Sequence, residues 1–208
     1  MPAPNKNDIH WRITGATSEE AAAQVLEQEF RAIADEDVRD EALYNLADYL
    51  TDDWALGEAE RIAKSLQVWR IEKTWLYGKI ARHYAQLGCT RDAVRLLDEA
   101  VPIARSEGSE WQRAESLENI AEHLVALEEH AAALRLLEEA VSIARQSEEK
   151  NDIDASSVLS GIAQDLALAG EFTRAREVAE AIRNEHKRRR AVVRVSRMAR
   201  FTKNAKRV

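Results

Sequence analysis

Two segments of this chain carry nearly the same phrase about forty residues apart, and this repetition constrains the fold more than any other feature. Residues 95–105 read RLLDEAVPIAR, and residues 135–145 read RLLEEAVSIAR. Self-similarity at a period of this size is typical of helical arrays, in which each repeat is one supersecondary unit stacked on its neighbours. The sequence therefore predicts a helical solenoid.

An apolar stripe recurs four times along the chain. It is built on a large apolar residue followed by Ala, with another large residue three positions before and three positions after the pair. The four pairs are Leu46-Ala47, Ile80-Ala81, Ile120-Ala121 and Ile162-Ala163. Positions spaced in this way share one face of an amphipathic helix. Each stripe therefore predicts the first helix of a unit.

A second alanine follows each stripe after a constant interval and opens a second helix. These alanines are Ala59, Ala93, Ala133 and Ala175. Small residues are expected where two helix axes cross closely, because a larger side chain would push the helices apart. Glycines at Gly57, Gly88 and Gly170 predict the turn between the two helices in three units, whereas the third unit has Glu128 in that region.

We therefore predict an all-α, right-handed solenoid of stacked antiparallel helix pairs. Its four units cover about residues 38–68, 72–106, 111–147 and 154–184. The repeat domain, with a capping helix at each end, spans about 18–201, after a loose N-terminal arm at 1–17 and before a basic tail at 202–208.

The repeated pattern resembles the tetratricopeptide repeat family over about residues 24–201. The family usually has Gly where this chain has Ala47, Ala81, Ala121 and Ala163, and its usual Pro after the second helix is missing. The longer middle units resemble the roughly 42-residue variant found in kinesin light chains and many bacterial proteins. The resemblance implies a non-catalytic scaffold that binds a peptide or a protein segment.

In that family the concave groove is lined by the polar side of each unit's first helix. By resemblance, the predicted groove residues are Tyr44, Asn45, Asp48, Trp75, Lys79, Arg82, Gln86, Glu115, Asn119, Glu122, Ser157, Ser160 and Gln164. Asparagine and basic side chains in this set suit the backbone and the terminal carboxylate of an extended peptide, although Asp48 and Glu122 oppose a carboxylate. Trp75 is the best candidate for an exposed anchor, with packing between repeats as the alternative. A merely solvated helix face is the alternative for the groove.

The net charge of −7 hides a strong separation of charge. Residues 183–208 carry 11 Lys and Arg and one acid, for a net +10, and the other 182 residues carry a net −17. The predicted basic surface consists of Arg188, Arg189, Arg190, Arg194, Arg197 and Arg200. It is expected to cap the array, to bind an acidic partner or a second copy, or, less favoured because aromatic residues are few, to bind nucleic acid as a regulator.

The sequence carries no phosphate loop, nucleophile elbow, dinucleotide fingerprint or paired metal motif, so we predict no catalytic residue, metal or cofactor. His83, His123 and Asp165 hold equivalent places in successive units, but stacked helices would separate them by about 8–10 Å, too far to share one ion. Cys89 is the only cysteine. Without a long apolar segment or a secretory signal, we expect a cytoplasmic protein with no membrane association.

Overall fold

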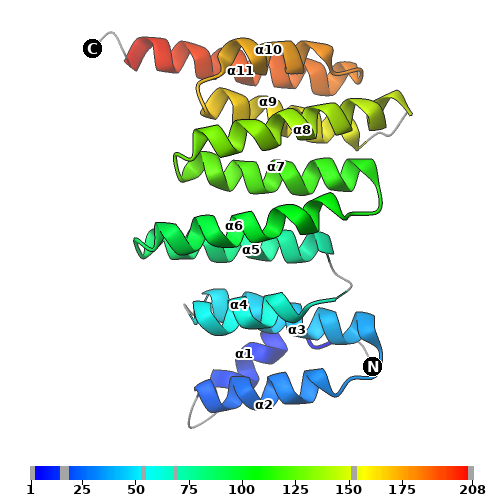
Figure 1. Ribbon diagram of the computed structural model, residues 1–208, viewed down its shortest axis with the longest axis vertical. Coiled ribbons are helices and arrows are strands. Elements are labelled where there is room, and N and C mark those ends of the chain that lie inside the picture. The colour runs from blue at the N-terminus through cyan, green and yellow to red at the C-terminus, as the bar shows by residue number, and fades with distance from the viewer. Residues whose placement is uncertain (1–2, 15–18, 53–54, 68–69, 151–153, 206–208) are drawn as a thin grey trace. The chain divides into compact units, whose positions relative to one another are not determined.

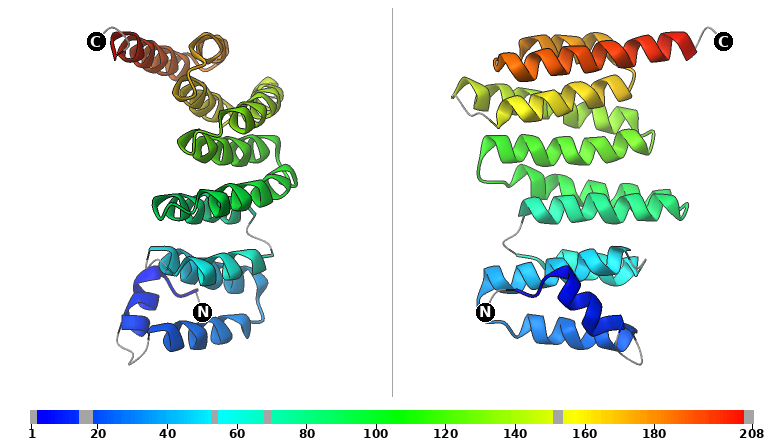
Figure 2. Two further views of the ribbon diagram at one scale, coloured as in Figure 1. Left: turned by 60° about the vertical axis from the view of Figure 1, so that its left-hand side comes forward. Right: turned by 180° about the vertical axis from the view of Figure 1, so that it is seen from behind.

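The computed structural model describes residues 3–14, 19–52, 55–67, 70–150 and 154–205. Within these residues the chain forms eleven helices and no strand, which confirms the predicted all-α class (Figures 1 and 2). The helices are α1 (Lys6–Thr14), α2 (Glu19–Arg31), α3 (Glu36–Asp52), α4 (Leu56–Ser65), α5 (Arg70–Gln86), α6 (Thr90–Arg105), α7 (Glu110–Ala126), α8 (His130–Glu149), α9 (Ala155–Leu168), α10 (Phe172–Ala181) and α11 (Glu185–Ala205). No helix in the described residues is long and apolar enough to cross a membrane.

The helices belong to two compact units, residues 1–100 and residues 101–208. In the first unit, α3 packs against α2, α4 and α5. In the second unit, α7 pairs with α8, α9 pairs with α10, and α11 packs on both α9 and α10. The alanines that the repeat placed at helix crossings are fully buried, from Ala47 and Ala59 in the first unit to Ala163 and Ala175 in the second. Their burial is the reason that each pair packs closely.

The turns inside the units share one backbone hydrogen bond. The N–H of Cys89 donates to the carbonyl of Tyr84 at 2.9 Å, and Glu129 and Glu171 donate in the same way to Leu124 and Leu166. This bond closes the helix when the residue before the donor has a left-handed backbone. Gly88 and Gly170 adopt φ of 77° and 87°, as the predicted turns require, and Glu128 adopts φ of 62° in the third unit.

The prediction that Gly57 makes the turn of the first unit is wrong. Gly57 lies in the first turn of α4, because the equivalent bond there runs from the N–H of Ala55 to the carbonyl of Leu50. The position that matches Gly88 is therefore Trp54, which lies outside the described residues. The pattern of the bond, and not the nearest glycine, locates this turn.

The two ends of the chain differ from the expected arm and tail. Lys6–Thr14 forms α1, which packs on α2 and α3 and buries Ile9 and Ile13. These isoleucines are four residues apart and share one helix face, so their burial offsets the cost of ordering a short helix. At the other end, α11 continues to Ala205, past the predicted boundary at residue 201.

Candidate binding face

The predicted groove residues of α3 hold the N-terminal segment of the same chain. The amide Nδ2 of Asn45 donates a hydrogen bond to the carbonyl of Pro4 at 3.0 Å. The Lys6 ammonium pairs with Asp48 at 2.6 Å and also with Asp52. Lys79 of α5 pairs with the same two carboxylates, at 2.7 Å for Asp52. The face of α3 therefore binds polypeptide through one amide and two acids.

The ion pairs decide the charge state of this first cluster. Burial alone would lower the pKa of Lys6, but hydrogen bonds with Asp48 and Asp52 raise it above its ordinary value. Burial would raise the pKa of Asp52, and the hydrogen bonds from Lys6 and Lys79 lower it instead. Lys6 and Asp52 therefore stay ionised together around neutral pH.

The predicted groove residues of α5 follow one another along a single side of that helix. Trp75, Lys79, Arg82 and Gln86 are spaced by three or four residues, which keeps them on one face. Trp75 is 42% exposed, and Arg82 and Gln86 are also exposed. A large, partly exposed aromatic ring beside two polar side chains is the kind of surface that anchors a protein partner.

In the second unit, α7 and α9 bring together acids that sequence reasoning missed. Of the predicted groove residues, Asn119 and Gln164 are half-buried, and Glu122 is exposed. Between the helices lie Glu118 and Asp165, whose carboxyl groups are hydrogen-bonded to each other. Asp165 is only 2% exposed, and its place in the repeat did not indicate a carboxyl pair.

Burial dominates the titration of this pair. It raises the pKa of Glu118 to about 9, and the charges of Asp165, Glu122 and Glu115 act in the same direction. Burial and the charge of Glu122 raise the pKa of Asp165 to about 7, although the hydrogen bond from Glu118 opposes the rise. The pair therefore holds a proton at neutral pH, as two carboxyl groups that share a site do.

Two buried oxygens beside this pair lack a hydrogen-bond partner within the described residues. They are Oδ1 of Asn119 and Oδ2 of Asp165. The Glu118 carboxyl lies against Gly161 of α9, where a Cβ atom would collide with it. The glycine thus makes room for the acid, and a repeated sequence motif does not reveal such a contact.

The predicted basic surface lies along α11 in the second unit. Arg194 donates a hydrogen bond to the side-chain carbonyl of Gln164, and Arg188 donates to the backbone carbonyl of Ile182 at 3.0 Å. The other predicted arginines, Arg189, Arg190, Arg197 and Arg200, are exposed. Part of this surface therefore holds α11 to its neighbours, and the rest faces solvent.

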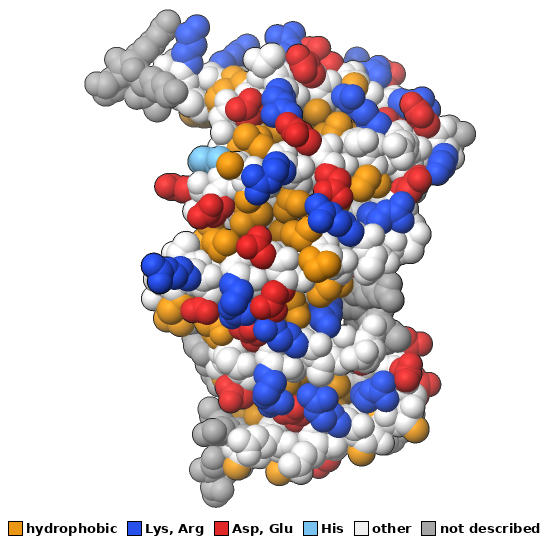
Figure 3. All heavy atoms as spheres, in the orientation of Figure 1, with side chains coloured by type: hydrophobic (Ala, Val, Ile, Leu, Met, Phe, Trp, Pro, Cys, Tyr) orange, Lys and Arg blue, Asp and Glu red, His pale blue; other side chains and the backbone are white. Residues whose placement is uncertain are grey.

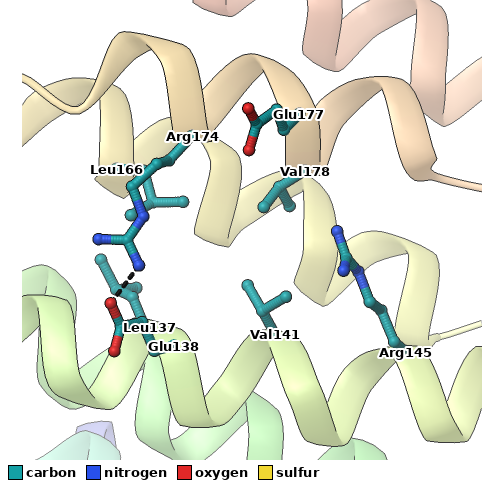
Figure 4. Close-up of a pocket in the computed structure, with 8 residues that line it drawn as sticks. All are labelled: Leu137, Glu138, Val141, Arg145, Leu166, Arg174, Glu177 and Val178. Carbon is teal, nitrogen blue, oxygen red and sulfur yellow. Dashed lines mark hydrogen bonds and ion pairs between the residues drawn. The ribbon is translucent and has the colours of Figure 1, made fainter.

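A small hollow on α8, α9 and α10 was not predicted. It has a volume of about 210 Å³ and is lined by Leu137, Glu138, Val141, Arg145, Leu166, Arg174, Glu177 and Val178. Figure 4 shows Arg174 reaching across from α10 to pair with Glu138 of α8. On the face shown in Figure 3, basic and acidic side chains are interspersed in the same way. The Arg174–Glu138 ion pair therefore joins α10 to α8 across the hollow.

The described residues contain no group of three or more His, Cys, Asp or Glu arranged to hold a metal ion. His83 is buried, and its Nδ1 lies 2.9 Å from the carbonyl of Lys79. Asp165 is hydrogen-bonded to Glu118. The chemistry of the face is therefore that of amides, carboxyl groups and an aromatic ring.

Stacked helix pairs with buried alanines at their crossings define a helical repeat protein. The family model described as tetratricopeptide repeat matches residues 72–146 and again residues 112–184, together more than half of the chain. The chain belongs to the tetratricopeptide repeat family. The predicted resemblance is confirmed, and its bacterial character stays a prediction.

Solved structures of other proteins share this fold. The crystal structure of Ton1535 from Thermococcus onnurineus NA1 matches with a TM-score of 0.56 at 17% identity, over 91% of this chain and 56% of that chain. The chain thus spans little more than half of Ton1535. A Podosopora anserina putative kinesin light chain with nearly identical TPR-like repeats matches with a TM-score of 0.52 at 19% identity, over 88% of this chain and 90% of that chain. No curated protein matches the chain. These likenesses show the solenoid fold alone.

Proposed function

We propose that the protein is a non-catalytic interaction module that binds a segment of a partner protein through the polar faces of α3 and α5 in the first unit or of α7 and α9 in the second. Tetratricopeptide repeats are in general protein-interaction modules. Absence of catalysis and a cytoplasmic location are part of the same proposal.

The observation that carries the proposal is the contact of α3 with residues 3–6. Asn45 binds a backbone carbonyl there, and Asp48 binds a lysine, so side chains predicted to line the groove already recognise polypeptide. Peptide recognition needs two kinds of contact. Here an amide binds the peptide backbone, and a charged group binds one side chain. Exposed Trp75 on the next helix adds an aromatic anchor.

The test is a pull-down from the source cell at moderate salt with the full chain. The doubly substituted variant Trp75→Ala, Arg82→Ala should lose at least 90% (about tenfold) of the captured partner, because an anchor typically contributes more than 1 kcal/mol. The matched control is Arg176→Ala, an exposed arginine of α10 that pairs with Glu180. Equal capture by all three proteins would overturn the groove proposal.

The nucleic-acid alternative stays a prediction, and a variant separates it from the groove. Replacing Arg190, Arg197 and Arg200 by Gln should leave partner capture unchanged if the groove carries the function. Loss of capture in this variant, together with strong salt dependence, would place the function on α11.

A further inference from the structure

We propose that the face formed by α7 and α9 binds an extended segment of a partner protein that carries a lysine or an arginine, in the way that α3 binds residues 4–6. The inference rests on the proposed function and names the chemistry of its ligand. The partner side chain would place its cation among Glu122, Glu118 and Asp165, and its backbone would bind Asn119.

The first step is the precedent within the chain. On α3, Asn45 donates to the Pro4 carbonyl, and Asp48 pairs with Lys6 two residues further on. The spacing from carbonyl to lysine suits the two side chains, which are three residues apart on one helix face. This arrangement is a working example of how an Asn and an acid on a first helix read a basic segment.

The second step is that α7 repeats this pair in register. Asn45 stands two residues before the repeat alanine Ala47, and Asp48 stands one residue after it; Asn119 and Glu122 stand in the same places around Ala121. The equivalent positions of the other two units are Lys79 and Arg82 on α5 and Gly161 and Gln164 on α9. Among the four predicted units, only α3 and α7 therefore carry an Asn with an acid.

The third step is the source of positive charge. In the first unit, Lys79 of α5 reaches Asp48 and supplies one cation from within the chain. Its equivalent on α9 is Gly161, which has no side chain, and Glu118 lies against it. Glu118 is hydrogen-bonded to Asp165 of α9, and the charges of Glu115 and Glu122 act on Glu118. On α11, which also packs on α9, Arg194 contacts Gln164. The α7–α9 face thus carries several acids and has no side chain at the place of Lys79.

The fourth step concerns the two buried oxygens that lack a hydrogen-bond partner. Asp165 is 2% exposed, and its Oδ2 accepts no hydrogen bond from the described residues; the same holds for Oδ1 of Asn119. The Asp165 carboxyl is hydrogen-bonded to Glu118 of α7, and the charge of Glu122 acts on it. A buried carboxyl group is stabilised strongly by an ammonium or guanidinium group, and a buried amide oxygen by a backbone N–H. Both donors occur in an extended basic segment.

The test uses the full chain and three short peptides with the composition of residues 3–7: acetyl-Ala-Pro-Asn-Lys-Asn-amide and its forms with Gln or Glu in place of Lys. Calorimetry should show the lysine peptide binding at least tenfold more tightly than the Gln form. The variant Glu122→Gln changes an exposed side chain and keeps the fold, and it should weaken the lysine peptide about tenfold, as should Asn119→Ala. The matched control Glu177→Gln removes the same charge from exposed α10 and should change nothing.

Two outcomes overturn the inference. One is equal binding of the Lys and Gln peptides, or binding that Glu122→Gln leaves unchanged. The other is concentration-dependent dimerisation of the intact chain that Lys6→Gln abolishes, since the occupant would then be the N-terminal segment of a second copy. A partner captured through Trp75 and Arg82 but unaffected by Glu122→Gln would refute the basic ligand and keep the proposed function; no capture at all would refute both.

Discussion

Buried acids are handled in opposite ways by the two compact units. In the first unit, Glu60 is 9% exposed and receives Arg95 at 2.9 Å and Lys64 at 2.8 Å. Burial would raise its pKa, but these two hydrogen-bonded cations lower it to about 2. In the second unit, Asp165 contacts another acid, Glu118, and its pKa rises to about 7. One repeat scaffold therefore produces a paired carboxylate in one unit and a proton-sharing pair in the other.

The difference teaches that the neighbouring helix decides what a buried acid does. Arg95 of α6 and Lys64 of α4 neutralise Glu60 from within the chain, so the acid stabilises the fold. Across from Glu118, α9 offers Gly161 and Asp165, so the acid is held at a cost in stability. A buried acid that is held at a cost in stability is typical of a functional position.

The largest expected effect comes from removing the charge of Glu60, the buried acid that is paired with two cations. Glu60→Gln should lower the free energy of unfolding by about 2 kcal/mol at pH 7, because it removes the charge that two cations bind. The folded pKa of Glu60, about 2, lies below its ordinary value of 4.5. Its contribution is therefore complete above pH 4.5 and is lost as the pH falls toward 2. Urea unfolding at pH 7 and pH 3 measures the difference, with Glu29→Gln as an exposed control.

The opposite change in the free energy of unfolding is expected when the Glu118–Asp165 pair is removed. Asp165→Asn should raise the free energy of unfolding by about 1–2 kcal/mol at pH 8 and should have little effect at pH 4. The folded pKa of Asp165 is about 7, above its ordinary value of 3.8, so the wild-type protein loses stability as the pH rises between these values. Urea unfolding of the wild type and the variant at pH 8 and pH 4 measures this gain in stability. A gain that does not depend on pH would contradict the proton-sharing pair.

A smaller effect on stability is expected from the turns, where the two units have different residues at the same backbone position. Glu128 has φ of 62° where Gly88 has φ of 77°. Glu128→Gly should therefore stabilise the protein by about 0.5–1 kcal/mol, and Gly88→Ala should destabilise it by about 1 kcal/mol, because only glycine adopts this backbone without strain. Thermal unfolding followed by circular dichroism checks both. Equal signs for the two variants would contradict the shared turn geometry.

The smallest expected effect concerns the segment bound to α3. Lys6→Gln removes one partly exposed ion-pair partner of Asp48 and Asp52, so the free energy of unfolding should fall by less than about 1 kcal/mol. Hydrogen exchange of the α1 amides should nevertheless become faster, because one of the contacts that hold the helix on α3 is then lost. Unchanged protection of Ile9 and Ile13 would show that the lysine is not needed for docking.

Much of the fold could be predicted because its causes are local. The stripe around Leu46 and the later Ala59 repeat in four units, and periodicity alone states which residues face the core. The same periodicity states which side of each first helix is polar, and the resemblance to the tetratricopeptide repeat family indicates that this side lines the groove. The identification of Asn119 and Glu122 as a pair equivalent to Asn45 and Asp48 also needs only the register of the repeat.

Tertiary structure alone decided which of those polar groups meet. Glu118 and Asp165 stand at non-equivalent places of different repeats, and their contact depends on the space left by Gly161. Likewise, α1 forms because Ile9 and Ile13 find a surface on α2 and α3, and because Lys6 finds Asp48 some forty residues away. The sequence by itself determined the helices and their faces, since these depend on residues within one or two turns. Burial and charge pairing depend on neighbours far along the chain, and for that reason only the folded structure decided them.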